Sequence, residues 1–253
     1  MRRFFVEEIN IQDGLCSITG SEAKHITKVL RMRKGDTLIL VDGKGSRFQA
    51  IIESATPKEV QVAIEKELPV PPPPPVEISV CQALLKSRPM DYLVQKTSEL
   101  GVASIYPFCS ERTIIRPKED GLTNKVRHWR EIAKSSTKQS DRTMIPDIHP
   151  IWSFREILER WRDEDAFKVI LWEEEGSEDL KSVLRKTSPE KTFAGLVGPE
   201  GGFGKEEVVS ARNAGFTSVS LGYRILRAET AAITLVAVVQ YEWGDLSLSP
   251  KDA

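Results

Sequence analysis

The chain has 253 residues, of which 40% are hydrophobic and 29% charged, and its formal net charge is −1. This composition is typical of an ordinary soluble globular protein that forms one large domain or two smaller ones. No apolar run is long enough to cross a membrane and no signal-peptide core follows the N-terminus, so we expect a cytoplasmic protein with no membrane partner.

The first 68 residues carry short strand patterns and one helical pattern. Strands are expected around residues 4–6, 15–18, 37–41, 48–52 and 60–64. Between Ser21 and Arg31 an apolar stripe at helical spacing predicts a helix that Ser21 caps, with Ala23, Ile26, Val29 and Leu30 facing inward. We therefore expect a small β-barrel-like domain over residues 1–68.

Residues 69–75 include five consecutive prolines and predict a stiff polyproline II linker. After this linker, strand patterns alternate with helical ones through residues 76–253. Strands are expected at 78–84, 103–108 and 167–172, and helices at 90–100, 122–139 and 151–162. Such alternation predicts an α/β domain with a mainly parallel sheet covered on both faces.

A glycine-rich stretch, Val197–Phe203, directly follows the apolar strand pattern of residues 193–197. Glycine there permits positive φ, which we expect at Gly201, and lets other atoms approach the backbone. The spacing matches neither a Walker phosphate loop nor a dinucleotide fingerprint. Taken alone, such a stretch is more often only a turn.

Two further stretches have the same strand–loop construction. Residues 219–232 pass from a short strand through Gly222 into a helix that begins near Ala228, and the strand pattern at 167–172 breaks into three glutamates. Ligands of α/β proteins bind at the carboxyl ends of strands. We therefore expect these three strand ends to surround one pocket.

The charges are unevenly distributed although they nearly cancel. Residues 24–34 contain five Lys or Arg residues and no acid, whereas residues 163–179 are strongly acidic. A charge run is most often a solvated face, yet this asymmetry permits a polyanionic partner such as nucleic acid. The three cysteines and three histidines are isolated from one another, so no metal is expected.

With Val-Gly-Pro-Glu-Gly-Gly-Phe (197–203) and Leu-Gly-Tyr-Arg-Ile-Leu-Arg-Ala-Glu-Thr-Ala (221–231) in view, the chain resembles the RsmE family of ribosomal RNA methyltransferases. Further landmarks occur in the family's order at residues 2–5, 96–102, 138–142 and 145–146. The sequence departs from the family pattern at Asp141, where glycine is usual. The resemblance covers nearly the whole chain.

The resemblance implies a fold of the SPOUT class, whose C-terminal part forms a trefoil knot, behind a PUA-like RNA-binding domain. It also implies that S-adenosylmethionine donates a methyl group to N3 of a uridine in the 16S RNA of the small ribosomal subunit, and that the protein is a homodimer. The residues themselves leave two other classes open, a 2′-O-ribose methyltransferase and a non-enzymatic RNA-binding protein.

The resemblance and the three strand ends together assign site residues. For the cofactor we expect Leu171, Trp172, Glu173, Val197, Gly198, Pro199, Glu200, Gly201, Gly202, Leu221, Gly222, Arg224, Ile225, Leu226, Arg227 and Thr230. For RNA we expect Arg2, Arg3, Lys24, Lys28, Arg31, Arg33, Lys96 and Arg142.

A cation near the neighbouring carbonyl oxygens would favour the uridine anion, and a carboxylate or a water could accept the N3 proton. We expect Arg227 as the cation and Glu229 or Glu200 as the carboxylate. The alternatives are structural: Glu229 complements the dipole of its helix, Arg227 pairs with Glu229, and Glu200 only fixes its loop.

The last helical pattern, residues 231–243, is apolar nearly all round. Such a helix is buried on more than one side, and we expect the same helix of a second subunit to cover one of them. Val239 is expected at that contact, and Arg142 is expected to reach toward the partner's cofactor loops.

Overall fold

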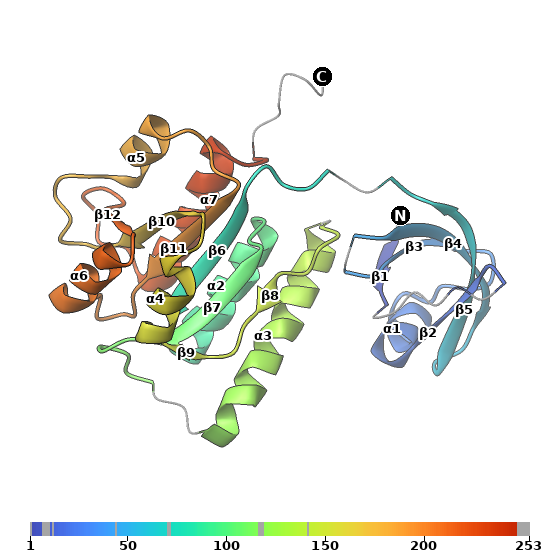
Figure 1. The fold of residues 1–253 in the computed structure, drawn as a ribbon. Coiled ribbons are helices and arrows are strands. Elements are labelled where there is room, and N and C mark those ends of the chain that lie inside the picture. The colour runs from blue at the N-terminus through green and yellow to red at the C-terminus, as the bar shows by residue number, and fades with distance from the viewer. Residues whose placement is uncertain are drawn as a thin grey trace. The chain divides into compact units, whose positions relative to one another are not determined.

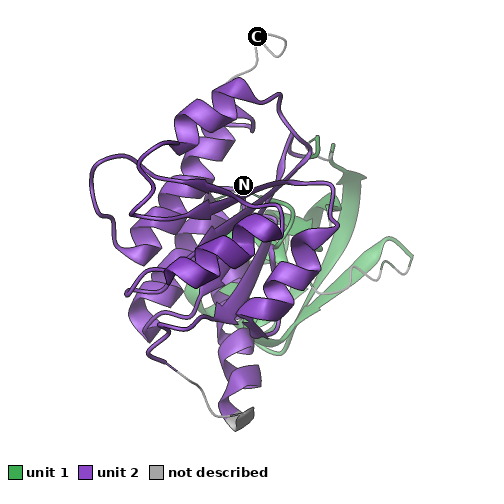
Figure 2. Ribbon diagram, turned by 60° about the vertical axis from the view of Figure 1, so that its left-hand side comes forward, with its two compact units in different colours: residues 1–73, 137–145 green, residues 74–136, 146–253 purple. Residues whose placement is uncertain are grey.

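The computed structural model describes residues 2–6, 11, 13–43, 45–69, 72–115, 119–140 and 142–246. The chain forms two compact units (Figure 2): unit 1 comprises residues 1–73 and 137–145, and unit 2 comprises residues 74–136 and 146–253. Asp141 and residues 70–71 of the expected linker lie outside the described residues.

Unit 1 is built on a five-stranded sheet that curls (Figure 1). The strand order is β1-β3-β4-β5-β2, and every pair is antiparallel except β1–β3. Fully buried side chains such as Phe4, Ile18 and Ile52 form its core. The strands are β1 (Arg2–Phe5), β2 (Leu15–Thr19), β3 (Thr37–Val41), β4 (Arg47–Ala55) and β5 (Glu59–Glu67). This arrangement confirms the small β-rich N-terminal domain.

The expected helix at Ser21–Arg31 is divided into α1 (Gly20–Lys24) and a π-helical turn, η1 (His25–Val29). The Leu30 N–H donates to the His25 carbonyl at 2.9 Å, a bond over five residues that widens the turn. Ala23 and Ile26 are fully buried as expected, but Val29 is 68% exposed. The expected inward position of Val29 was wrong, because the wider turn changes the helical spacing. Capping by Ser21 was also wrong, since the N-cap is Thr19.

Unit 2 contains a seven-stranded parallel sheet (Figure 1). Its order is β12-β10-β11-β6-β7-β8, and β9 also pairs with β7. The strands are β6 (Glu77–Ala83), β7 (Ser104–Cys109), β8 (Asp147–Ile148), β9 (Trp152–Ser153), β10 (Phe167–Leu171), β11 (Thr192–Val197) and β12 (Thr217–Val219). The helices are α2 (Ser87–Glu99), α3 (Glu119–Gln139), α4 (Phe154–Arg162), α5 (Leu180–Lys186), α6 (Lys205–Asn213) and α7 (Ala228–Glu242).

Helices cover both faces of this sheet, as the alternating pattern predicted. On one face Ala194 and Leu196 of β11 join a core cluster with side chains of α4 and α6. On the other face Gly195 lies so close to Leu235 of α7 that an added Cβ would collide with it. Because both faces are buried, β11 is an almost continuous apolar run. The trefoil knot that the resemblance implies stays a prediction.

Two local differences from the sequence expectations concern the helices. The helix expected from residue 151 begins at Phe154, because Trp152 and Ser153 pair with β7 and the Ser153 hydroxyl accepts the N–H of Glu156 as an N-cap. The short helix α5 was not predicted. Among the described residues, no helix has the length and apolar character that spanning a membrane requires.

Candidate active site

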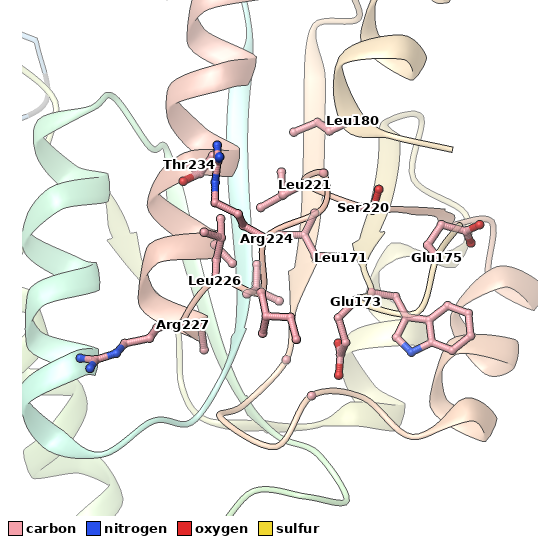
Figure 3. A pocket seen from close by; sticks show the side chains of 18 of the residues that line it. Leu171, Glu173, Glu175, Leu180, Ser220, Leu221, Arg224, Leu226, Arg227 and Thr234 are labelled. Atoms are coloured by element: carbon pink, nitrogen blue, oxygen red, sulfur yellow. The ribbon is translucent and has the colours of Figure 1, made fainter. Parts of the chain in front are cut away.

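The carboxyl ends of four neighbouring strands, β12, β10, β11 and β6, open into one pocket of about 1120 Å³ (Figure 3). Residues from the loops after these strands line it, joined by side chains of α7. Leu171, Leu221 and Leu226 contribute apolar surface. The pocket lies entirely within unit 2.

The glycine stretch after β11 forms a tight turn that is also a wall of the pocket. The Gly202 N–H donates to the Pro199 carbonyl at 3.0 Å, and the buried Gln82 side chain of β6 donates to the Gly198 carbonyl at 3.0 Å. Gly202 has φ of +67°, and an added Cβ there would collide with the Glu173 carboxylate. Positive φ therefore belongs to Gly202 and not to Gly201, where we expected it.

The loop after β10, residues 172–179, is tied to α6. Glu175 forms an ion pair with Arg212 at 2.6 Å, and its side chain is only 7% exposed. The Arg212 guanidinium also lies over the Trp172 ring, 5.8 Å from its centroid. A hydrogen bond from the Ser177 side chain lowers the pKa of Glu175 to about 2. Burial acts in the opposite direction, whereas the nearby charge of Arg212 lowers this pKa further. This loop is therefore fixed from outside the pocket.

The loop after β12, residues 220–227, carries exposed side chains to the pocket mouth. Tyr223 is fully exposed and Ile225 is 89% exposed. Arg227 is the N-cap residue of α7 and Glu229 lies in the first turn of that helix. In Figure 3 the Arg227 side chain extends away from the loop that carries Glu173. Among the described residues no ion pair joins Arg227 to Glu229, which argues against the structural alternative for this arginine.

Glu200 is held at the opposite wall. The backbone N–H of Lys86, directly before α2, donates to Glu200 Oε1 at 3.2 Å. One carboxylate oxygen thus supports the loop, as the structural alternative proposed, while the side chain remains exposed in the pocket.

Nearly all of the expected cofactor residues line this pocket, as do Arg227, Glu229 and Glu200. Two expected residues do not: Gly201 packs against Arg112 instead, and Thr230 faces outward from α7. Sequence reasoning missed lining residues such as Lys86, Glu175, Asp179, Leu180 and Thr234. A signal existed for Asp179, which precedes an apolar helical pattern and caps α5 by accepting the Ser182 N–H at 3.0 Å.

The expected RNA-binding residues differ in accessibility. Arg2, Lys24, Lys28, Arg31 and Arg33 of unit 1 are exposed, whereas Arg142 is half-buried. Arg3 is also half-buried, and burial together with the nearby Arg47 lowers its pKa. Lys96, in unit 2, is hydrogen-bonded to both carboxylate oxygens of Glu99 at 2.9 and 3.0 Å. Its charge is therefore already matched within the chain.

Comparison with protein families agrees with this architecture. A family described as an RNA methyltransferase domain matches residues 72–240, and one described as an RNA methyltransferase PUA domain matches residues 18–65. The first match includes every strand of the unit 2 sheet and all the residues that line the pocket. The fold and the pocket thus define an RNA methyltransferase, which sets aside the non-enzymatic alternative.

The chain belongs to the ribosomal RNA small subunit methyltransferase E family. The protein of that name from Bacillus subtilis is 29% identical over 255 residues, with 96% of this chain and 97% of the relative covered. Its namesake from Mesomycoplasma hyopneumoniae is 32% identical, with 93% and 97% covered. These shares agree with a resemblance over nearly the whole chain.

Solved structures show the same likeness. A ribosomal RNA small subunit methyltransferase E from Neisseria gonorrhoeae, bound to S-adenosylmethionine, superposes with a TM-score of 0.88 at 32% identity and covers 98% of this chain and 100% of its own. A methyltransferase from Legionella pneumophila in complex with S-adenosylmethionine gives a TM-score of 0.86 at 32% identity, with 96% and 98% covered.

Proposed function

We propose that this protein transfers a methyl group from S-adenosylmethionine to N3 of a uridine in small-subunit ribosomal RNA, in the cytoplasm. The observation that carries the proposal is the pocket at four strand ends, which combines a fixed, acidic wall with an exposed, basic one. Its relatives of known name act on small-subunit ribosomal RNA, and two similar structures contain S-adenosylmethionine. That the RNA is methylated within the small ribosomal subunit belongs to the same proposal.

The lining residues fit this cofactor. Leu171, Leu221 and Leu226 offer apolar surface for a flat adenine, and the bare backbone of Gly198 and Gly202 offers hydrogen-bonding groups. Glu173, Glu178 and Asp179 also line the pocket, and their negative charge would favour a ligand that carries a sulfonium and an ammonium. The volume of about 1120 Å³ exceeds that of an ordinary ligand pocket and leaves room for a base as well. When bound, S-adenosylmethionine supplies a methyl group on a positively charged sulfur.

The chain's own residues then prepare the nucleophile. N3 of uridine attacks with a free lone pair only after its proton has left. Arg227 provides the positive charge that stabilises the resulting anion at the neighbouring carbonyl oxygens. Glu229 or Glu200 accepts the proton. Among the described residues the Glu229 carboxylate has no ion pair and accepts no hydrogen bond, whereas Glu200 already accepts one from the Lys86 N–H.

Unit 1 supplies RNA affinity in this proposal. Lys24, Lys28, Arg31 and Arg33 are exposed on or directly after α1 and η1, so they can contact phosphates without rearrangement. Replacing Arg31 and Arg33 by Ala is expected to weaken RNA binding and to flatten its dependence on salt while cofactor affinity stays constant. An unchanged salt dependence would show that the basic residues 24–34 do not contact RNA and only form a solvent-exposed surface.

We also propose a homodimer that forms through α7. Ile233, Ala237 and Tyr241 lie four residues apart on one stripe, and this apolar stripe is half to largely exposed. Val239, which the sequence placed at the contact, is fully buried inside unit 2 because it faces the sheet side of the helix. Ile233→Glu is therefore the test: light scattering should show monomers, with circular dichroism unchanged. That Arg142 reaches toward the partner's pocket stays a prediction.

The proposed reaction is tested by incubating the protein with S-adenosylmethionine and small ribosomal subunits that lack the modification. Mass spectrometry of the resulting nucleosides should detect uridine methylated on the base at N3. A methyl group on the ribose 2′-oxygen would instead support the second enzymatic class. Absence of any methylated nucleoside, with cofactor binding intact by calorimetry, would refute the proposed substrate.

A further inference from the structure

A second hollow, of about 430 Å³, lies in unit 2 outside the pocket described above. Arg88, Asp91, Tyr92 and Gln95 of α2 form one side of it, and Ile132, Ser135 and Ser136 of α3 form the other. We call it the α2–α3 groove. Tyr92 is 51% exposed, so a large aromatic ring remains accessible at the groove.

The aromatic ring belongs to a stripe with a cation on each side. Arg88, Tyr92 and Lys96 are four residues apart and therefore share one face of α2. Lys96 Nζ lies 5.9 Å from the centroid of the Tyr92 ring, and Glu99 holds that ammonium at 2.9 Å. The ring is thus supported in place before any partner arrives, which lowers the entropy cost of binding against it.

The acidic groups at the groove are already engaged within the protein. The Asp91 carboxylate accepts a hydrogen bond from Trp129 Nε1 at 3.2 Å and contacts His128 Nε2 at 3.1 Å. Arg88, in contrast, is exposed and has no ion pair among the described residues. The groove therefore offers a guanidinium for a phosphate, a ring for stacking, and the amide of Gln95 for a base edge.

The groove and the methylation pocket are both lined by residues at or directly before helix α2. Lys86 and Pro89, at the start of α2, line that pocket, and Tyr92 follows about 9 Å further along the helix at 1.5 Å per residue. A base that enters the pocket must leave its stack, so its neighbours in the strand lose a stacking partner. An aromatic side chain at this distance can replace that partner.

We propose that the α2–α3 groove binds a single-stranded nucleotide that flanks the methylated uridine, with Tyr92 stacking on its base and Arg88 contacting its phosphate. This inference rests on the proposed function. Stacking on aromatic side chains and positive charge along the backbone are the two features by which proteins hold single-stranded RNA. Both are present here in one helical stripe.

The test compares Tyr92→Ala, Tyr92→Phe and Arg88→Ala with the wild type on small ribosomal subunits and on single-stranded oligouridylate. Loss of one stacked base weakens binding by roughly tenfold or more, so Tyr92→Ala should raise KM for the subunit and Kd for oligouridylate by that factor. Tyr92→Phe keeps the ring and should stay within about threefold. Arg88→Ala should reduce the slope of log K against log salt by about 0.7.

Matched controls come from exposed positions on other helices, Val209→Ala on α6 and Arg155→Ala on α4, which should leave RNA affinity unchanged. Affinity for S-adenosylmethionine, measured by calorimetry, should be equal in all variants. Wild-type RNA affinity in Tyr92→Ala would overturn the inference. A change from dimer to monomer in that variant would also overturn it, because the groove would then be a contact with a second copy. If the wild type transfers no methyl group at all, the proposed function fails, and oligouridylate binding alone decides on the groove.

Discussion

Two loops that line the pocket follow the neighbouring strands β10 and β12, and they are held in very different ways. Residues 172–179, after β10, are tied to α6 through the ion pair of Glu175 with Arg212 at 2.6 Å and that of Glu174 with Lys205 at 3.5 Å. Residues 220–227, after β12, carry Tyr223 and Ile225 almost fully exposed. The two arginines of this second loop, Arg224 and Arg227, form no ion pair among the described residues.

This difference in how the two loops are held indicates that they have different roles in binding. A loop that is already fixed loses little entropy when a ligand binds, which suits the cofactor. A loop with free cations and exposed apolar side chains keeps its binding groups available for an anionic partner. We therefore propose that the tied loop and the glycine turn, together with Leu221 and Leu226, bind the cofactor, and that the exposed side chains of the free loop contact RNA.

The largest effect is expected in the free loop from Arg227→Ala. Removing a charge that stabilises the developing anion commonly lowers kcat by about 10²- to 10³-fold. Affinity for S-adenosylmethionine, measured by calorimetry, should change little, because the residues proposed to bind the cofactor lie elsewhere in the pocket. Arg224→Ala is the matched control and should lower kcat far less. If Arg227→Ala loses cofactor affinity in proportion to activity, the separation of the two walls is wrong.

The next effect is expected at the tied wall from Gly202→Val. The φ of +67° at Gly202 is strained for a β-branched residue, and a Cβ there would also push the exposed Glu173 carboxylate out of its position. Affinity for S-adenosylmethionine should fall by about 100-fold while circular dichroism remains that of the wild type. Gly201→Ala serves as the control, since its Cβ would lie 3.4 Å from Arg112 Cβ and the residue does not line the pocket. Equal effects of both substitutions would contradict the assignment.

A smaller effect is expected when the tie itself is cut. Arg212→Ala should raise Kd for S-adenosylmethionine by about tenfold, because the loop must then be ordered by the ligand. Arg212→Lys keeps the charge but not the planar fork, and should recover part of the loss. Arg185→Ala removes a comparable ion pair with Glu242, at 2.9 Å and away from the loop, and should leave Kd unchanged. Identical losses in Arg185→Ala would show a general effect of stability.

The smallest effect concerns pH. The pKa of Glu175 falls from an ordinary value of 4.5 to about 2, so its carboxylate stabilises the fold above pH 4.5 and this contribution is lost as pH falls through about 2. Between these values the melting temperature of the wild type should fall more steeply than that of Glu175→Gln. We expect a difference of about 2–4 °C, the effect of about 1 kcal/mol in a chain of this size. Parallel curves would show that the tie contributes nothing to stability.

The strand–loop units and the type of sheet could be predicted from the sequence, because they depend on residues that are neighbours along the chain. Apolar runs that end in glycine or in consecutive glutamates predicted the three strand–loop units, and the alternation of strand and helix patterns predicted a parallel sheet covered on both faces. The acidic character of residues 173–179 was visible too. Its meaning was not, since Arg212 lies on a helix that follows a different strand.

The sequence by itself determined the classes of residue on each element, and through two motifs it determined the family. Only the tertiary structure decided which residues meet. The strand order β12-β10-β11-β6 brings Lys86 and Thr234 to the same pocket, although neither lies in a motif. The tertiary structure also buries Val239 within unit 2, and a π-helical turn in unit 1 leaves Val29 exposed. Local patterns fix the period of a helix or strand, whereas the neighbours of each face depend on contacts between residues far apart in the chain.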